Sequence, residues 1–306
     1  MSLPLRIDTE VRDALREGRG VVALETTVLA HGLPWPDNLR TVQAMIQTVR
    51  EQGAVPAAIG IRAGEVVIGL SAEALEHFAH GEDIAKVSRR DIAALLTNGG
   101  DGATTVAATM LCARAAGIEV FATGGIGGVH RGVAETWDIS ADLRELGRTA
   151  VAVVCSGAKS ILDLPKTLEM LEYEGVPVVG LGVDRFPAFF VRDSGLAVSA
   201  SVKDLDDAER LVRAHLDLEG SGLLIANPAP EHAALDDQQV ESWIARAIEQ
   251  ARLAGIAGKA LTPYLLASLA ELSEGRTLRT NEALLIDNAR IAAGIATRLA
   301  RDPKPV

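Results

Sequence analysis

The sequence has few aromatic residues and few cysteines. Three tryptophans, two tyrosines and five phenylalanines make up 3% of the 306 residues, so alanine, valine, leucine and isoleucine must build most of the core. Cys112 and Cys155 are the two cysteines, and both stand in apolar segments. A disulfide framework is therefore not expected, and the sequence predicts a reducing, cytoplasmic location.

Long apolar runs and an excess of positive charge are also missing. Runs such as residues 176–183 are far shorter than the roughly 20 residues that span a bilayer. The first 20 residues mix acids with bases and lack the apolar centre of a signal peptide. The net charge is −11, which disfavours binding to a nucleic acid backbone but allows a local basic pocket for one phosphate. We expect a small-molecule substrate, with no membrane and no nucleic acid partner.

Segments with strand-like and helix-like patterns alternate along most of the chain. Residues 118–123 and 150–155 read as apolar strands, residues 37–54 have helical spacing, and the last 70 or so residues read as helices over 236–254, 262–274 and 280–301. This alternation predicts an α/β fold with a largely parallel central sheet covered by helices on both faces. Because no repeat or long linker interrupts it, we expect residues 1–306 to form a single domain. Functional sites in such sheets gather at the carboxyl ends of the strands.

Lysine is scarce, which makes Lys159 conspicuous. Arginine occurs 24 times and lysine six times, and Lys159 follows the buried-strand pattern "VAVVCSG". An amine attacks carbonyl-type carbon only when it is neutral, and burial or a nearby cation lowers a lysine pKa from its usual value of about 10.4. The sequence therefore allows a nucleophile here, or a side chain that reaches water beside the following helix.

Two acidic segments permit more than one interpretation. Glu25 follows "GVVAL" and is either a general acid/base or a strand-end carboxylate bonded to backbone. Asp138 and Asp142 in "ETWDISADL" are four residues apart, so a helix would place both on one face. Such sparse oxygen ligation suits Mg²⁺ or Mn²⁺. The alternative is a helix N-terminus capped by Ser140 or Asp138.

Two glycine-rich turns, "NGGDGATTVAAT" and "TGGIGG", raise the question of phosphate binding. The first runs into a predicted helix, whose N-terminal N–H groups could hold a phosphate, or both are simply tight turns. Neither matches a P-loop or a dinucleotide motif. Lys86 could add positive charge there, or pair with Asp83 or Asp91. Zinc-type spacing and a serine-hydrolase motif are absent from the sequence.

Taken together and in order, these segments resemble the pseudouridine-5′-phosphate glycosidase family, also called indigoidine synthase A-like. The likeness extends from about residue 5 to about residue 300, nearly the whole chain. The segments that carry it are "ALETTVLAHGLPWPDN", "AKVSRRDIA", "NGGDGATTVAATM", "FATGGIGGVHRG", "TWDISADL", "CSGAKSILDLPKTLEMLE", "GLLIANPAP" and "RTNEALLIDNARIAA".

The resemblance implies reversible, lyase-type cleavage of pseudouridine 5′-phosphate to uracil and ribose 5-phosphate through a lysine Schiff base, as a step of pseudouridine degradation. It further implies a three-layer α/β/α sandwich, a divalent metal (usually Mn²⁺) and a homotrimer. The family's catalytic lysine falls on Lys159, its proton donor on Glu25 and its metal-bound aspartate on Asp138. The positions matching its substrate contacts, with less direct matches at the last two, are Lys86, Val106 (through its backbone), Ser140, Ala141, Asp142, His130 and Asn281.

Two other functions stay open at this point. The protein could make or break a different carbon–carbon glycosidic bond in secondary metabolism. It could also be a catalytically silent protein that binds sugar phosphates, although the presence of Lys159, Glu25 and Asp138 argues against silence.

Overall fold

The computed structural model describes residues 4–81, 83–218, 220–256 and 258–301. Its centre is a run of parallel strands in the order β3-β2-β7-β8-β11-β9-β10. In chain order these strands are β2 (Val21–Leu24), β3 (Val55–Arg62), β7 (Val120–Ala122), β8 (Ala152–Cys155), β9 (Val178–Leu181), β10 (Ala200–Val202) and β11 (Leu223–Ala226).

A smaller group of strands extends the sheet beyond β3. The far half of β3 pairs antiparallel with β4 and with β6, while β1 lies parallel to β4 and β5 lies parallel to β6. These strands are β1 (Leu5–Ile7), β4 (Glu65–Ile68), β5 (Ala85–Val87) and β6 (Gly102–Thr104). The sequence of residues 56–70 predicts two strands around a turn at residues 63–65, and the structure confirms this as the β3–β4 hairpin. The short strands β1, β5, β6 and β10 carry too few residues to show a pattern in the sequence.

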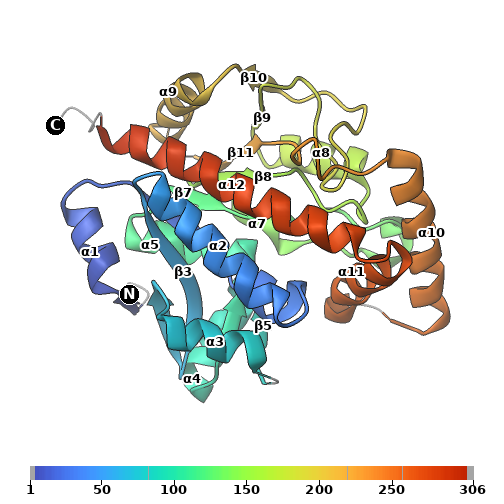
Figure 1. The fold of residues 1–306 in the computed structure, drawn as a ribbon, viewed down its shortest axis with the longest axis horizontal. Coiled ribbons are helices and arrows are strands. Elements are labelled where there is room, and N and C mark those ends of the chain that lie inside the picture. Colours follow the sequence, from blue (N-terminus) through green and yellow to red (C-terminus); the bar gives the residue numbers. More distant parts are fainter. Residues whose placement is uncertain (1–3, 82, 219, 257, 302–306) are drawn as a thin grey trace.

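Helices cover both faces of the sheet, which confirms the predicted three-layer sandwich with a largely parallel sheet. In Figure 1, α2 and α12 lie side by side in front of the strands, and α5 and α7 lie behind them. Flanking these layers are α9, which packs on α12, α8, which packs on α7, and the pair α10 and α11. The helices are α1 (Thr9–Arg16), α2 (Asp37–Glu51), α3 (Ala72–His80), α4 (Ile92–Asn98), α5 (Val106–Ala116), α6 (Val133–Thr136), α7 (Ala141–Leu146), α8 (Leu164–Tyr173), α9 (Leu205–Leu216), α10 (Asp237–Leu253), α11 (Leu261–Leu272) and α12 (Arg276–Arg301), with short turns at Val28–Gly32, Arg89–Asp91 and Gly258–Ala260.

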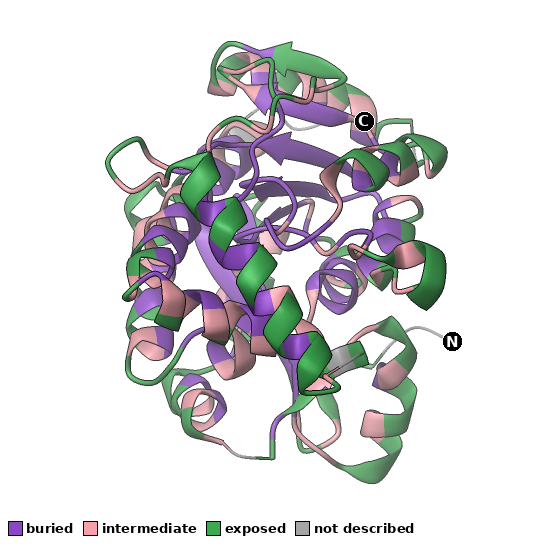
Figure 2. Ribbon diagram, turned by 90° about the vertical axis from the view of Figure 1, so that its right-hand side faces the viewer, coloured by how far each residue is buried: buried purple, intermediate pink, exposed green. Residues whose placement is uncertain are grey.

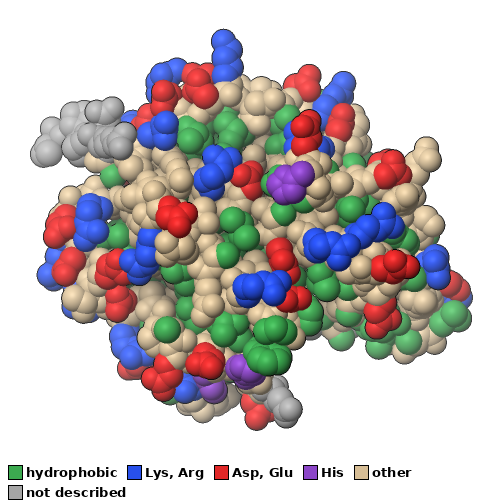
Figure 3. Space-filling view, in the orientation of Figure 1, with side chains coloured by type: hydrophobic (Ala, Val, Ile, Leu, Met, Phe, Trp, Pro, Cys, Tyr) green, Lys and Arg blue, Asp and Glu red, His purple; other side chains and the backbone are tan. Residues whose placement is uncertain are grey.

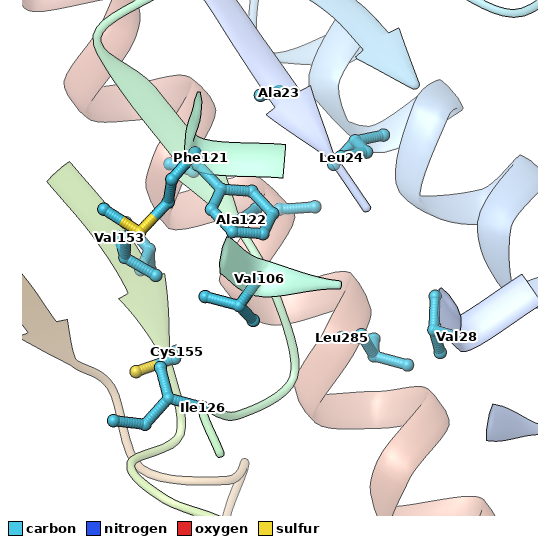
Figure 4. Close-up of a cluster of buried hydrophobic side chains, with 14 of the residues drawn as sticks. Ala23, Leu24, Val28, Val106, Phe121, Ala122, Ile126, Val153, Cys155 and Leu285 are labelled. Carbon is cyan, nitrogen blue, oxygen red and sulfur yellow. The ribbon is translucent and has the colours of Figure 1, made fainter. Parts of the chain in front are cut away.

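The core is aliphatic, as the composition predicts. Figure 2 shows central strands that are buried along their length, an edge strand that is exposed, and outer helices that are buried only on their inward side. Figure 4 shows how Phe121 of β7 lies beside Val153 of β8, with Val106 of α5 close by. Small side chains such as Ala23 and Ala122 lie among them and are fully buried (Figure 4). Burying each large aliphatic side chain contributes about 1.5–3 kcal/mol.

The start of α11 differs from the sequence prediction. In the sequence, Thr262 before Pro263 predicts an N-cap followed by a proline in the first turn, but α11 begins at Leu261, after Ala260, which makes no capping bond. Thr262 therefore lies inside the first turn, and that prediction was wrong. Pro263 also lies in this turn, where a missing N–H breaks no helical hydrogen bond.

The surface and the cysteines agree with the composition. On the face that carries α12 and α2, acidic and basic side chains are interspersed (Figure 3). Within the described ranges, every helix is too short or too polar to cross a bilayer. Cys112 and Cys155 are buried free thiols, and burial raises the pKa of each to about 12.

Candidate active site

A cavity of about 410 Å³ opens at the carboxyl ends of the central strands. Residues that follow β2, β7 and β8 form its floor, while β5, the start of α5, the start of α7 and the helices α11 and α12 form its walls. Every site residue predicted from the sequence lines this one cavity: Glu25, Lys86, Val106, His130, Asp138, Ser140, Ala141, Asp142, Lys159 and Asn281. The structure therefore brings the whole predicted set together, and the role of each residue remains a prediction.

Glu25 lies at the bottom of the cavity, directly after β2. Its side chain is 8% exposed, and the buried Thr123 hydroxyl donates a hydrogen bond to its Oε1 atom. Burial raises the pKa of Glu25, although the neighbouring Lys159 and the Thr123 bond act in the opposite direction. Of the two interpretations left open by the sequence, this environment favours an acid/base group, because burial keeps the proton on the carboxyl to higher pH.

Lys159 reaches the same cavity from the loop after β8. Its Nζ atom donates to the Gly125 carbonyl oxygen at 3.0 Å, and its backbone N–H donates to the Ile126 carbonyl oxygen at 3.1 Å. The side chain is therefore anchored in the cavity wall, which does not fit the alternative of a lysine reaching bulk water beside α8. The charge of Lys159 acts to lower the pKa of Glu25, so the amine and the carboxyl are close enough to interact within one cavity.

The glycines of "TGGIGG" are explained by close packing of site residues against the backbone. A Cβ atom on Gly125 would lie 2.6 Å from the Phe189 ring. A Cβ atom on Gly127 would collide with Ser140 and Asp142. Glycine at these two positions lets α7 and the Phe189 loop approach the strand end that carries Thr123, because only glycine leaves that space open.

Asp142 links the two glycine-rich segments, "NGGDGATTVAAT" and "TGGIGG", through hydrogen bonds to their backbone. It is 7% exposed, and its carboxylate accepts from the backbone N–H groups of Ala107 at 3.0 Å and Gly127 at 2.9 Å. A negative charge at the start of α5 is favoured by the helix dipole. The Ala107 N–H therefore already has a protein partner. Val106, whose backbone the resemblance assigns to substrate, opens α5 and lines the cavity.

Asp138 and Asp142 do not share a helix face, and the alternative prediction, a helix N-terminus capped by Ser140, is confirmed. Ser140 is extended and is the N-cap of α7, because its Oγ atom accepts from the Asp142 N–H at 3.2 Å. The helix begins only at Ala141, and Asp138 stands before it. The two aspartates therefore have different surroundings: Asp142 is buried and bonded to backbone, whereas Asp138 is half-buried on the cavity wall beside His130.

His130 lies on the cavity wall in surroundings that favour the neutral form of its imidazole. Burial lowers its pKa, although the Asp138 carboxylate acts in the opposite direction. The two residues are linked through the backbone, where the His130 N–H donates to the Asp138 carbonyl oxygen at 3.0 Å. A neutral imidazole beside a carboxylate offers polar atoms to a ligand without adding a positive charge.

The donor set can be tested against a divalent metal. Across the described part of the chain, no group of three or more His, Cys, Asp or Glu side chains is arranged to hold an ion. One carboxylate on a cavity wall nevertheless fits Mg²⁺ or Mn²⁺, since these ions favour oxygen ligands and Mg²⁺ in particular keeps several waters. Asp138 fits that role, and Asp142 does not, because backbone N–H groups already occupy its carboxylate.

The model of the family described as "Indigoidine synthase A like protein" matches residues 10–298. The chain belongs to the indigoidine synthase A-like family. The resemblance predicted from the sequence motifs is thus confirmed.

Curated relatives and solved structures agree with this membership. The chain is 52% identical over 294 residues to a pseudouridine-5′-phosphate glycosidase of Caldanaerobacter subterraneus subsp. tengcongensis, covering 96% of each chain. It is 54% identical to one of Chloroflexus aurantiacus, covering 97% of this chain and 99% of the other. The crystal structure of the prealnumycin C-glycosynthase AlnA in complex with ribulose 5-phosphate has a TM-score of 0.90 and 41% identity, covering 97% of both chains. An indigoidine synthase A-like protein from Thermotoga maritima has a TM-score of 0.89 and 36% identity, covering 98% of this chain and 97% of the other.

Several residues of this family site were not predicted from the sequence. Thr123 follows β7 just as Glu25 follows β2, so the strand-end rule could have identified it. His31 and Ser88 also line the cavity, and the buried Nδ1 atom of His31 has no hydrogen-bond partner among the described residues. Phe189 and the start of α11 come from segments with no polar signal. Only the folded chain brings these residues to the cavity.

Proposed function

We propose that the protein reversibly cleaves the carbon–carbon glycosidic bond of pseudouridine 5′-phosphate, giving uracil and ribose 5-phosphate. The observation that carries this proposal is the presence of the Lys159 amine and the buried Glu25 carboxyl in the same cavity. Relatives at 52% and 54% identity that bear the glycosidase name support it, as does a C-glycosynthase of the same fold in complex with a sugar phosphate.

The chemistry requires an electron sink at C1′, because the leaving atom is carbon C5 of uracil. In the proposed first step Glu25 gives its proton to the ring oxygen as the C1′–O4′ bond breaks, and the uracil N1 proton is lost so that C1′ becomes doubly bonded to C5. The Lys159 amine then adds to C1′, and the proton at N1 is restored. General acid help of this kind is typically worth about 10²–10⁴-fold in rate.

The second half of the reaction releases the base. A proton is added at C5, the C1′–C5 bond breaks, and the lysine nitrogen donates its electron pair to form an iminium at C1′. Water then hydrolyses the C=N bond, which frees Lys159 and leaves the aldehyde form of ribose 5-phosphate. The sum is one pseudouridine 5′-phosphate and one water converted to one uracil and one ribose 5-phosphate. Covalent catalysis thus divides one difficult step into easier ones.

The remaining residues hold the substrate. Lys86, the Val106 N–H and the Ser140 hydroxyl supply positive charge and donors suited to the phosphate and ribose oxygens. His130, in the loop before α6, and Asn281, on α12, line the same cavity, and both offer polar atoms for the base. Asp138 would hold the divalent ion, which supplies polarisation of the uracil carbonyls and an ordered water when it is bound.

The proposed substrate can be tested directly. Incubation of the protein with Mn²⁺ and pseudouridine 5′-phosphate should yield uracil and ribose 5-phosphate in equal amounts, measured by liquid chromatography. The reverse mixture of uracil and ribose 5-phosphate should yield pseudouridine 5′-phosphate. Turnover of a different C-nucleotide, with none of this one, would favour a C-glycosynthase activity like that in AlnA's name. Tight binding without turnover would instead indicate a silent sugar-phosphate-binding protein.

The metal assignment gives a separate prediction. Asp138→Ala should lose both rate and response to Mn²⁺, because the protein ligand to the ion is removed, with Mn²⁺ binding weakened by about 10²-fold or more. Electron paramagnetic resonance of free Mn²⁺ measures the binding without reference to turnover. Asp184→Ala, an exposed aspartate away from the cavity, is the matched control and should behave as the unchanged protein. Equal Mn²⁺ binding by both variants would refute the assignment.

A homotrimeric assembly and a role in pseudouridine degradation are parts of the same proposal. The family resemblance supports both. Sedimentation equilibrium tests the first, with a mass of three chains expected.

A further inference from the structure

Thr123 lies in the floor of the cavity, and the reaction steps proposed above give it no role. Its side chain is fully buried, and its hydroxyl donates to Oε1 of Glu25. The contact follows from the sheet register, in which Leu24 of β2 is paired with Ala122 of β7. The next residue of each parallel strand is Glu25 on one and Thr123 on the other, so their side chains meet at the edge of the sheet.

The backbone of Thr123 is fixed from both sides. Its N–H donates to the Val154 carbonyl oxygen of β8 at 3.0 Å. Its carbonyl oxygen accepts from Nδ2 of Asn288 at 2.9 Å. Asn288 is fully buried on α12, and Asn227, after β11, donates to its Oδ1 at 3.0 Å. A buried polar network of this kind is rigid when its members are bonded, so the Thr123 hydroxyl has a fixed position relative to the sheet.

The same short segment also holds the lysine. Two residues after Thr123, the Gly125 carbonyl accepts from Nζ of Lys159. Between them, the Gly124 carbonyl oxygen accepts a hydrogen bond from the Ser156 N–H at 2.8 Å. Residues 123–125 therefore position both proposed catalytic groups: the Thr123 hydroxyl bonds to Glu25, and the Gly125 carbonyl oxygen bonds to Lys159.

We propose that Thr123 is a positioning residue that holds the Glu25 carboxyl in its reactive orientation and directs its proton to Oε2. This inference rests on the proposed function. Oε1 already accepts a hydrogen bond from the hydroxyl, so Oε2 is the oxygen that carries the transferable proton. A hydroxyl donor also stabilises the carboxylate more than the carboxylic acid. The Thr123 bond thus limits the rise in the pKa of Glu25 that burial causes.

The test compares Thr123→Val with Thr123→Ser. Valine has nearly the shape of threonine but has no hydroxyl, so Glu25 loses its donor. We expect kcat for pseudouridine 5′-phosphate to fall by about 10–10²-fold, as is typical when a reacting group loses its alignment, with little change in KM. The high-pH limb of the kcat/KM profile should move to higher pH, because a donor that lowers the pKa of Glu25 is gone. Serine keeps the hydroxyl and should restore most of the rate and the pH profile.

Thr109→Val is the matched control. Thr109 is also fully buried and also donates from its hydroxyl, to Thr104 at 2.9 Å, but it does not line the cavity. Its loss should lower stability without moving the pH limb. Thermal unfolding of all three variants shows whether the valine change has disturbed the fold. If Thr123→Val does not fold, Thr123→Ser decides the matter: a folded serine variant whose high-pH limb is shifted, although its hydroxyl is present, would overturn the proposal.

A second measurement needs no substrate. The C=O stretching band of a protonated carboxyl, assigned to Glu25 by its loss in Glu25→Gln, can be followed by infrared spectroscopy as pH is raised. Its titration midpoint should rise in Thr123→Val and stay in place in Thr123→Ser. If the unchanged protein fails to cleave pseudouridine 5′-phosphate, the proposed function fails while this titration still decides the role of Thr123. Equal midpoints in the unchanged protein and Thr123→Val would contradict the positioning role.

Discussion

Lys159→Ala is expected to abolish the release of uracil from pseudouridine 5′-phosphate while leaving the fold intact. The side chain makes one hydrogen bond, to the Gly125 carbonyl, so its removal costs little stability. It removes the nucleophile, however, and losses of the order of 10⁴-fold or more are typical when a covalent step disappears. Steady-state turnover and thermal unfolding measure the two effects separately.

Two further lysine variants sharpen this prediction. Lys159→Arg keeps the positive charge and a donor but has no nucleophilic amine, so it should be as inactive as the alanine variant. Lys166→Ala is the control, because Lys166 is exposed on α8 and pairs with Asp163 at the surface; exposed pairs of this kind contribute about 0–1 kcal/mol. Substantial activity in Lys159→Arg would show that charge, and not covalent attack, is what this position supplies.

Glu25→Gln is expected to have the second largest effect. Glutamine keeps the shape and can still accept from the Thr123 hydroxyl, but it cannot give a proton to the ring oxygen. A loss of about 10²–10⁴-fold in kcat is the usual cost of removing a general acid. Glu51→Gln, an exposed glutamate at the end of α2, provides the matched control and should leave the rate unchanged.

The pH dependence gives the same prediction a sign. Burial raises the pKa of Glu25, so the protonated acid persists to higher pH than for an ordinary glutamate, and activity should fall as pH rises through that value. The folded chain also binds this proton more tightly than the unfolded chain. The resulting stabilisation is complete below the unfolded pKa and is lost as pH rises through the folded one. Glu25→Gln should remove this pH-dependent part of the unfolding free energy, and an unchanged profile would mean that the carboxyl does not titrate there.

The sequence predicted the fold because its signals are local and repeated. Apolar strands such as residues 150–155 alternate with amphipathic helices such as residues 37–54, and this pattern has one common solution, a parallel sheet between helical layers. The strand-end rule then placed Glu25 and Lys159 on one edge. The single-domain prediction for residues 1–306 follows from the same pattern and stays a prediction.

What the sequence could not predict depends on contacts between distant segments. The Asp142 carboxylate accepts hydrogen bonds from the N–H groups of Ala107 and Gly127. These bonds form only because α7 packs beside α5 in the folded chain. The choice between Ser140 and Asp138 as the cap of α7 stayed open for the same reason, since nothing local distinguishes the two. The partnership of Thr123 with Glu25 depends on strand register, which is fixed only when β2 and β7 pair.

Trapping the covalent intermediate tests the central claim most directly. Sodium borohydride added during turnover of pseudouridine 5′-phosphate reduces an iminium to a stable secondary amine, and mass spectrometry of the digested protein then locates the added group. A reduced ribose phosphate on Lys159, absent from Lys159→Arg, is the predicted result. Full turnover with Lys159 unmodified, or with the sugar attached to another side chain, would contradict the claim that this amine forms the bond to C1′.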